Sequence, residues 1–194
     1  MPIRLTLICH GATDATRRAA FPRDEPLEAK AATLAAGLGL ARSANTQVFV
    51  SPALRARETA EAMGLVAIPE PALRDLDHGR WAGSTLAEIE AEEPAALALW
   101  LADPESAPHG GESIAELLAR AGAWLGGLDA LGDGPVLAIT HAAVIRAAIL
   151  HALGAPASGF WRIDVAPLSR TELHGRAGAW TLRSLAWRER HQSG

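Results

Sequence analysis

The feature that most constrains the fold is a series of short apolar runs, separated by segments of helical character. Residues 3–9 and 135–140 are apolar runs of strand length, and residues 47–50 form a shorter one. A nearly continuous apolar run is typical of a strand buried on both faces, as in a parallel sheet. The pattern predicts an α/β three-layer sandwich with a mostly parallel central sheet and helices on both faces.

The remaining elements follow from helical periodicity and from glycine and proline positions. We expect an extended basic loop over residues 14–26, a third strand over 66–68 and a loop over 73–83. Ser51 is expected to cap the second helix, Pro94 to kink the third, and Ser113 to cap the fourth. The expected helices span residues 27–42, 52–63, 86–101, 114–128 and 142–153, and an edge hairpin is expected over 169–173 and 179–187.

Composition limits the class of protein. The 194 residues are 49% apolar, which predicts a single domain over 1–194 with one well-filled core. A net charge of -4, with both signs spread along the chain, predicts no binding to nucleic acid or to an anionic membrane. One cysteine allows neither an internal disulfide nor a cysteine-based metal site, and the N-terminal apolar run is too short for a signal or a membrane span. We therefore expect a cytoplasmic protein with small-molecule partners.

Two histidines stand directly after apolar strands. His10 follows the run 3–9, and His141 follows the run 135–140. Ligands of open α/β sheets bind beyond the carboxyl ends of the strands, so the two side chains are expected to converge there. A metal site would need a third ligand such as Asp75, but the nearby arginines favour an anion. We assign no metal and no cofactor.

Several blocks of sequence occur in a recognisable order. They read LICHGAT at 7–13, SPALRARETA at 51–60, LRD at 73–75 followed by GRWAG at 79–83, GGES at 110–113, and ITHAAVIR at 139–146. Together these blocks resemble the histidine phosphatase superfamily, in its phosphoglycerate mutase-like branch. Each block alone is common, whereas the ordered set is specific.

The resemblance implies a role for each matched residue. His10 matches the nucleophile, which attacks phosphorus in line and becomes phosphohistidine. Arg55 matches the arginine that clamps the phosphate with its planar fork. His141 matches the second histidine, which supports the charge that develops during transfer, and Ala142 offers a backbone N–H at a helix start.

The proton for the leaving alcohol is expected from a carboxylic acid. The resemblance places this role on Asp75, which would later activate the water that hydrolyses phosphohistidine. Asp75 is one methylene shorter than the glutamate usual in the family. Asp77 and His78 therefore remain alternatives for the proton donor.

The chain departs from the family pattern beside the nucleophile. Cys9 replaces the usual arginine, Ala12 replaces a glutamate or its equivalent, and Thr16 replaces an asparagine. We expect Arg17, Arg18 or Arg23, in the following basic loop, to restore the lost charge. The substrate-binding residues expected from these arguments are Cys9, Gly11, Thr16, Arg17 and Ala142.

The function expected from the resemblance is hydrolysis of a small-molecule phosphomonoester through a phosphohistidine on His10. The partners are a small phosphorylated metabolite or inorganic phosphate, and a homodimer is allowed. A catalytically degenerate binding or regulatory protein of the same fold is an alternative, because of Cys9, Ala12 and Thr16. A phosphoglycerate mutase-type phosphotransferase is a second alternative. It is less favoured because the chain lacks a long insertion that would enclose a bisphosphate.

Overall fold

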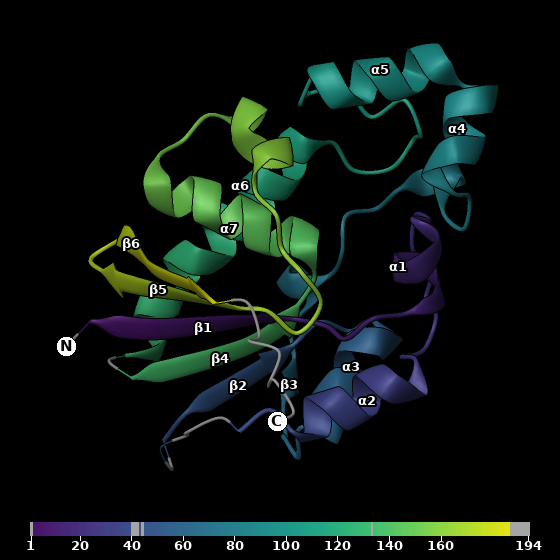
Figure 1. The fold of residues 1–194 in the computed structure, drawn as a ribbon. Coiled ribbons are helices and arrows are strands. Elements are labelled where there is room, and N and C mark those ends of the chain that lie inside the picture. Colours follow the sequence, from purple (N-terminus) through teal and green to yellow (C-terminus); the bar gives the residue numbers. More distant parts are fainter. Residues whose placement is uncertain (1, 40–42, 44, 133, 187–194) are drawn as a thin grey trace, which may run out of the picture.

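A six-stranded sheet forms the middle layer of the computed structural model, which describes residues 2–39, 43, 45–132 and 134–186 (Figure 1). The strand order is β3-β2-β4-β1-β5-β6. The first four strands run parallel, whereas β5 and β6 form an antiparallel hairpin beside β1. The strands are β1 (Ile3–Cys9), β2 (Gln47–Val50), β3 (Ile68–Pro69), β4 (Pro135–Thr140), β5 (Arg170–Arg176) and β6 (Ala179–Ala186).

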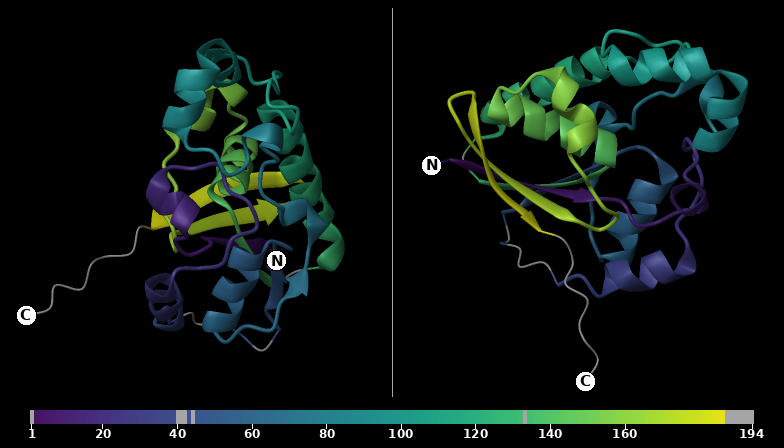
Figure 2. Two further views of the ribbon diagram at one scale, coloured as in Figure 1. Left: turned by 90° about the vertical axis from the view of Figure 1, so that its right-hand side faces the viewer. Right: turned by 45° about the horizontal axis from the view of Figure 1, so that its top comes forward.

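Helices cover both faces of the sheet, as predicted. α6 and α7 lie on one face and α2 and α3 on the other, while α4 and α5 extend beyond the sheet (Figures 1 and 2). The helices are α1 (Asp14–Arg18), α2 (Ala29–Ala36), α3 (Leu54–Ala62), α4 (Leu86–Glu92), α5 (Pro94–Ala102), α6 (Ile114–Gly127) and α7 (Ala142–Leu153). Short 3₁₀ turns are η1 (Pro71–Leu73), η2 (Gly79–Trp81), η3 (Leu128–Leu131) and η4 (Ala157–Arg162). None of the described helices is both long and apolar enough to cross a membrane.

Alternate side chains of β1 enter two different cores. Leu5, Leu7 and Cys9 belong to the larger cluster, which also contains the buried faces of α6 and α7. Ile8 belongs to a smaller cluster shared with β2, β4 and α3. Because successive side chains of a strand point to opposite faces, the end of β1 that is buried on both faces, residues 7–9, is apolar, whereas Arg4 is exposed.

The register between β1 and β4 brings the two histidines together. Cys9 pairs with Thr140 as the last residues of these adjacent parallel strands. His10 and His141 follow immediately, and the backbone N–H of His10 donates to the carbonyl of Thr140 at 2.8 Å. This register explains why both residues lie at the same edge of the sheet, as the sequence predicted.

Three expectations for the first third of the chain differ from the structure. Residues 14–18 form α1 instead of an extended loop, because Thr13 and Thr16 make a capping box at its start. Ser51 is not the N-cap of α3, which is Ala53; the Ser51 hydroxyl accepts from the Ala53 N–H at 3.3 Å and also lies 2.7 Å from His141 Nε2. The expected helix over 27–42 is shorter, ending at Ala36, and its residues 40–42 lie outside the described part.

Further differences concern Pro94 and the strands. Pro94 begins a new helix, α5, in its first turn, because a residue before proline is disfavoured in helical conformation and Glu93 leaves it. The hairpin turn narrows to Ala177 and Gly178, both with positive φ, as two-residue turns require. The third strand, β3, has only Ile68 and Pro69, and the expected strand end at 187 is not described.

Candidate active site

His10 presents one free ring nitrogen at the carboxyl end of β1. Its Nδ1 lies 2.7 Å from the carbonyl oxygen of Gly11, which can only accept, so Nδ1 carries the proton. Nε2 therefore keeps its lone pair. Burial, assisted by the charges of His141 and Arg55, lowers the pKa of His10 to about 3, against the opposing effect of Asp75. The imidazole is neutral at pH 7, as a nucleophile must be.

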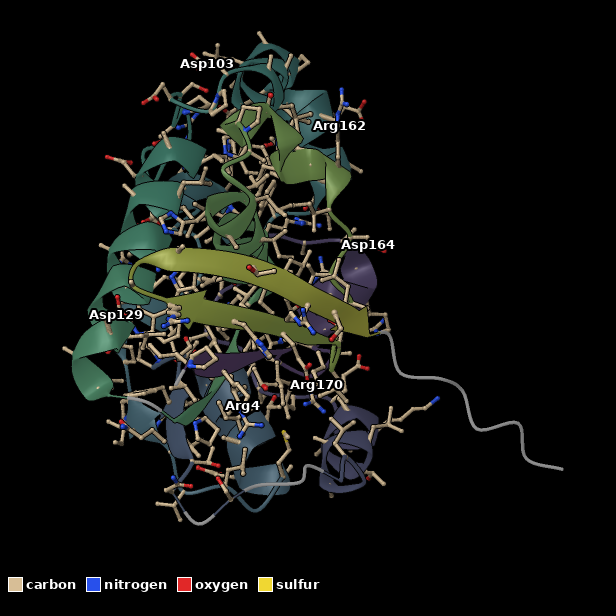
Figure 3. The ribbon with its side chains drawn as sticks, turned by 90° about the vertical axis from the view of Figure 1, so that its left-hand side faces the viewer. Arg4, Asp103, Asp129, Arg162, Asp164 and Arg170 are labelled. Atoms are coloured by element: carbon tan, nitrogen blue, oxygen red, sulfur yellow. The ribbon has the colours of Figure 1, made fainter. Side chains whose placement is uncertain are left out.

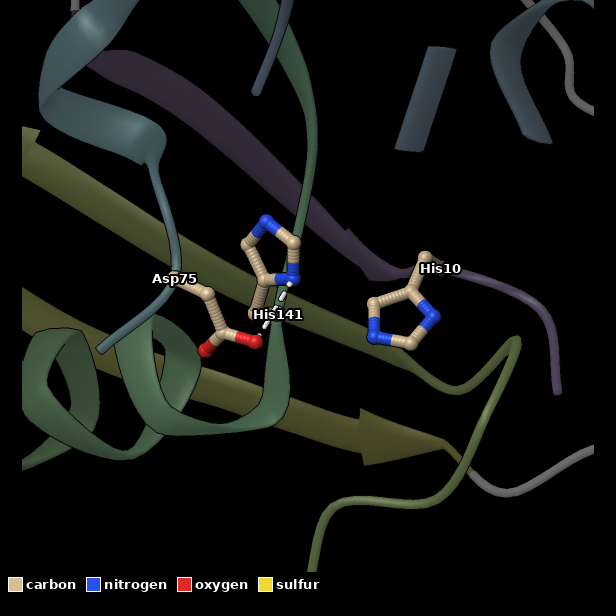
Figure 4. Close-up of side chains that lie close together, drawn as sticks. All are labelled: His10, Asp75 and His141. Atoms are coloured by element: carbon tan, nitrogen blue, oxygen red, sulfur yellow. Dashed lines mark ion pairs between the residues drawn. The ribbon is translucent and has the colours of Figure 1, made fainter. Parts of the chain in front are cut away.

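His141 lies beside His10 at the end of β4. The two ring centroids are 5.0 Å apart and the planes meet at 61°. His141 Nε2 is 2.7 Å from the Ser51 hydroxyl, and its Nδ1 is 3.2 Å from Asp75 Oδ2 (Figure 4). The ring is thus held from both sides, at 1% exposure.

Arg55 enters the site from the first turn of α3. It is 2% exposed, and its Nη2 donates to Asp75 Oδ2 at 2.6 Å, while Nη1 donates to the carbonyl of Arg23 at 2.6 Å. Thr59, one helical turn later, donates to the Arg55 carbonyl and accepts from the N–H of Gly11. This threonine ties α3 to the loop of the nucleophile, which accounts for the Arg-Ala-x-x-Thr spacing.

Asp75 is the acidic member of the cluster. Burial raises its pKa, but the charge and hydrogen bonding of His141 and the charge of Arg55 prevail and hold it well below the usual range. The carboxylate is therefore ionised in the ligand-free site. It also stands between the cavity and its two partners, since Asp75 lines the cavity whereas Arg55 and His141 do not.

A buried ion pair supports the Asp75 loop. Arg120 of α6 donates to the carbonyls of Ala72, Arg74 and Asp75, and its Nη2 is 2.7 Å from Glu112 Oε2. Sequence reasoning missed this arrangement, although Glu112 belongs to the GGES block. The sequence signal that could have revealed it is a charged residue, Arg120, next to the apolar stripe of α6.

A cavity of about 260 Å³ opens in front of His10. Its wall is largely aromatic, and a half-buried arginine, Arg146, completes it. The aromatic residues are Phe21, His78, Trp100, Phe160 and Trp161. A second cavity of about 270 Å³ is lined by residues that include Arg4 and Arg170, and His174 is the one histidine among its described lining residues. Figure 3 labels both arginines. The chemistry therefore belongs to the first cavity.

Only part of the expected substrate-binding set lines this cavity. Thr16 and Ala142 do so, whereas Cys9 and Gly11 do not. The Cys9 thiol is 2% exposed in the core. Burial, together with Asp75, raises the pKa of Cys9 to about 12, despite the opposing charges of Arg146 and Arg55. A thiol of this kind is neutral at pH 7 and unsuited to replace an arginine.

The expected substitute cations of the N-terminal segment are engaged elsewhere. Arg17 is paired with Asp14 and Glu28. Arg18 lies 3.5 Å from Asp14, and Arg23 donates to the carbonyl of Ala82. None of these three arginines is part of the cavity wall described above.

Three side chains of the site could also ligate a metal ion. His10, Asp75 and His141 each offer a ligand atom, and these atoms lie within 4.8 Å of one another. Arg55, however, lies 2.6 Å from the same carboxylate oxygen and would repel a divalent cation placed there. The arrangement favours an anion.

Two adjacent histidines, a buried arginine and a carboxylate at the carboxyl edge of an α/β sheet define the class of protein, a phosphoryl-transfer enzyme. A family model described as the histidine phosphatase superfamily (branch 1) matches residues 5–188. The chain belongs to this superfamily. The expected fold and the expected class of enzyme, a phosphomonoester hydrolase, are confirmed.

The similarity to known proteins extends over most of the chain. Glucosyl-3-phosphoglycerate phosphatase of Mycobacterium tuberculosis is 32% identical over 206 residues, covering 95% of this chain and 92% of that protein. A solved mycobacterial glucosyl-3-phosphoglycerate phosphatase with inorganic phosphate gives a TM-score of 0.78 at 30% identity, covering 93% of this chain and 95% of the other. The alpha-ribazole phosphatase of Shigella flexneri shares the fold, with a TM-score of 0.78, 23% identity and coverage of 94% and 95%.

The buried histidine predicts a loss of stability in mild acid. Below its ordinary pKa of 6.5 the unfolded chain binds a proton on His10, whereas the folded protein does not until about pH 3. Stability is therefore full at pH 7 and falls as the pH falls through this window. Between pH 7 and pH 5, His10 accounts for a loss of about 2 kcal/mol in the free energy of unfolding.

Urea unfolding of the wild type and of His10→Gln at both pH values measures this effect. The variant should show a smaller loss, with the remainder due partly to His78, whose pKa burial lowers to about 4. Asp75 does not contribute in this window, because its pKa is lowered from a value already below pH 5. Equal losses in the two proteins would contradict the neutral, buried state of His10.

Proposed function

We propose that the protein hydrolyses its phosphomonoester through a phosphohistidine on His10. The observation that supports this most directly is a neutral imidazole with a free Nε2 facing a cavity, next to Arg55, Asp75 and His141. In the first step the Nε2 lone pair forms a bond to phosphorus and the ester P–O bond breaks. The departing alkoxide takes a proton from the carboxylic acid of Asp75.

The second step returns the site to its starting state. Asp75, now a carboxylate, takes a proton from water, whose oxygen attacks phosphorus as the P–Nε2 bond breaks. Inorganic phosphate leaves and His10 regains its lone pair. Arg55 and His141 stabilise the negative charge on the transferring group in both steps.

Substrate binding must first displace the carboxylate of Asp75 from Arg55 and His141. In the ligand-free site this carboxylate accepts from Arg55 Nη2 and lies 3.2 Å from His141 Nδ1, the two groups that a phosphate oxygen would contact. A dianionic phosphate in its place would repel the carboxylate, and repulsion by a like charge raises a carboxyl pKa. Substrate binding thus favours uptake of a proton from solvent by Asp75, which becomes the proton donor that the first step needs.

The cavity wall favours an ester with a ring in its organic part. Trp161, 38% exposed at the cavity, offers a flat apolar face on which a sugar ring can stack. One relative acts, by name, on glucosyl-3-phosphoglycerate, which contains a sugar ring. We propose a phosphorylated sugar or ribose derivative as substrate.

The same proposal includes binding of inorganic phosphate, a single domain over 1–194, a cytoplasmic location and freedom to form a homodimer.

Replacing Asp75 by asparagine tests the mechanism. With an alkyl phosphate such as glucose 6-phosphate, loss of the proton donor should lower kcat/KM by about 10²- to 10⁴-fold. With p-nitrophenyl phosphate, whose leaving group needs no proton, Asp75→Asn should release one rapid equivalent of nitrophenolate and then turn over slowly. Stopped-flow absorbance and phosphate release measure the two phases.

Asp77→Asn is the matched control, because this carboxylate lies two residues away and bonds only the Gly79 N–H within the described residues. It should behave as the wild type. A uniform loss with both substrates and no rapid phase in Asp75→Asn would remove Asp75 as the proton donor. A wild type that releases phosphate from neither ester, nor from glucosyl-3-phosphoglycerate or phosphoserine, would instead favour the degenerate binding protein.

A further inference from the structure

The charges around the cavity leave an anionic substrate short of a cation. Arg55 is covered by Asp75 and bonded to it. The carboxylates of Glu25 and Asp75 both line the cavity, whereas His10 is neutral. Cys9, directly before the nucleophile, contributes a buried thiol. A phosphate dianion approaching His10 therefore needs positive charge from another element.

Arg146 supplies a cation at this place. It is the single arginine or lysine on the cavity wall among the residues that the structure describes. It belongs to α7, one helical turn after Ala142, and both residues line the cavity. The turn that follows His141 is the N-terminus of α7, where the helix dipole also favours an anion, and Arg146 shares the cavity with this turn.

The guanidinium is held in a defined position. Its Nε donates to the carbonyl of Ile163 at 2.7 Å, and its central carbon lies 5.6 Å from the ring centroid of Phe160 and 5.9 Å from that of Trp161. These contacts leave Nη1 and Nη2 without a hydrogen bond or ion pair to any described residue. Two donors on one edge of a fixed fork match two oxygens of a phosphoryl group.

Half-burial of this charge carries a cost that an anion would relieve. Burial lowers the pKa of Arg146, and the negative charges of Asp164 and Asp75 oppose this effect. The guanidinium nevertheless stays protonated in proteins. A half-buried charge is stabilised when a ligand of opposite charge binds its accessible donors.

We propose that Arg146 is a second phosphate-binding residue of this site, supplying from α7 the positive charge that the Cys9 position lacks. The inference rests on the proposed function and adds to it a group that contacts the transferring phosphoryl. It binds the incoming phosphate before Asp75 releases Arg55.

Equilibrium binding of inorganic phosphate tests this without turnover. Arg146→Gln should raise the phosphate Kd by about 10- to 100-fold, as expected for loss of hydrogen bonds from a charged group, and should lower kcat/KM for every ester by a similar factor. Arg162→Gln is the matched control, since Arg162 is exposed and lies outside the cavity (Figure 3). Titration calorimetry and phosphate release from p-nitrophenyl phosphate provide the readouts.

A folded Arg146→Gln that binds phosphate within twofold of the wild type overturns the inference. An effect confined to esters that carry a carboxylate in their organic part does so as well, because it would place Arg146 on that carboxylate. If the variant does not fold, phenylglyoxal modification of the wild type replaces it. Phosphate should then slow modification of Arg146 and not of Arg162, and equal rates with and without phosphate reject the inference.

These outcomes are separate from those of the proposed function. A wild type that binds phosphate and hydrolyses esters, with Arg146→Gln unchanged, rejects only the role of Arg146. A wild type that neither binds phosphate nor hydrolyses any ester rejects the proposed function and with it the inference.

Discussion

Replacement of His10 by alanine is expected to lower the rate of phosphate release by at least about 10⁴-fold, the scale at which loss of a nucleophile acts. The side chain supplies the atom that forms the covalent bond, and the free Nε2 of a neutral ring is the group in the cavity suited to that role. Reactions with ³²P-labelled ester, quenched with SDS at alkaline pH, should show labelled wild type and unlabelled His10→Ala. Phosphohistidine is identified by its lability in acid and stability in base.

His151→Ala is the control for this experiment. His151 lies exposed near the end of α7 and takes no part in the site described above, so its loss should leave both labelling and rate unchanged. If His10→Ala retains more than about one hundredth of the wild-type rate, water attacks phosphorus directly and the phosphohistidine step is wrong.

Replacement of Arg55 by alanine should produce the second large effect, on both activity and stability. The rate should fall by about 10²- to 10³-fold, because donors aimed at the transferring group are lost. The free energy of unfolding should fall by about 1 to 3 kcal/mol, because the Asp75 carboxylate loses its hydrogen-bonded ion pair with Arg55. Phosphate release and urea unfolding at pH 7 measure the two losses independently.

Two further variants make the Arg55 experiment specific. Arg55→Lys keeps a charge but not the planar fork, so it should recover part of the stability and less of the activity. Arg57→Ala removes an exposed arginine from the same helix and should change neither. An unchanged phosphate Kd in a folded Arg55→Ala would show that Arg55 serves the structure and not the phosphate.

Local sequence signals predicted the framework well, because each depends on neighbours along the chain. The apolar runs identify β1 and β4, and Ser113 with Glu116 makes the capping box that begins α6. Signals of the same kind failed where a distant partner intervened. Ser51 resembles an N-cap, but the N-cap is Ala53, and the Ser51 hydroxyl also contacts His141, ninety residues away in sequence.

The same contrast between local sequence signals and distant partners applies to the site. Matching to a family's blocks identified His10, Arg55, Asp75 and His141 as candidates, and the structure brings these side chains together. The charge missing at Cys9 was sought in Arg17, Arg18 and Arg23, because they are near in sequence. Nearness in sequence did not place them on the cavity, since capping of α1 and surface ion pairs direct these side chains elsewhere.

By itself, then, the sequence determined an α/β sheet with two histidines at one edge, because strand period, helix period and strand ends are local properties. Only the tertiary structure decided that Asp75 covers Arg55 and His141 in the ligand-free site. It alone also decided that Arg146, from a helix that packs over β1, faces the cavity beside the buried Cys9. Such distances depend on how separate elements pack, and no spacing along the chain encodes them.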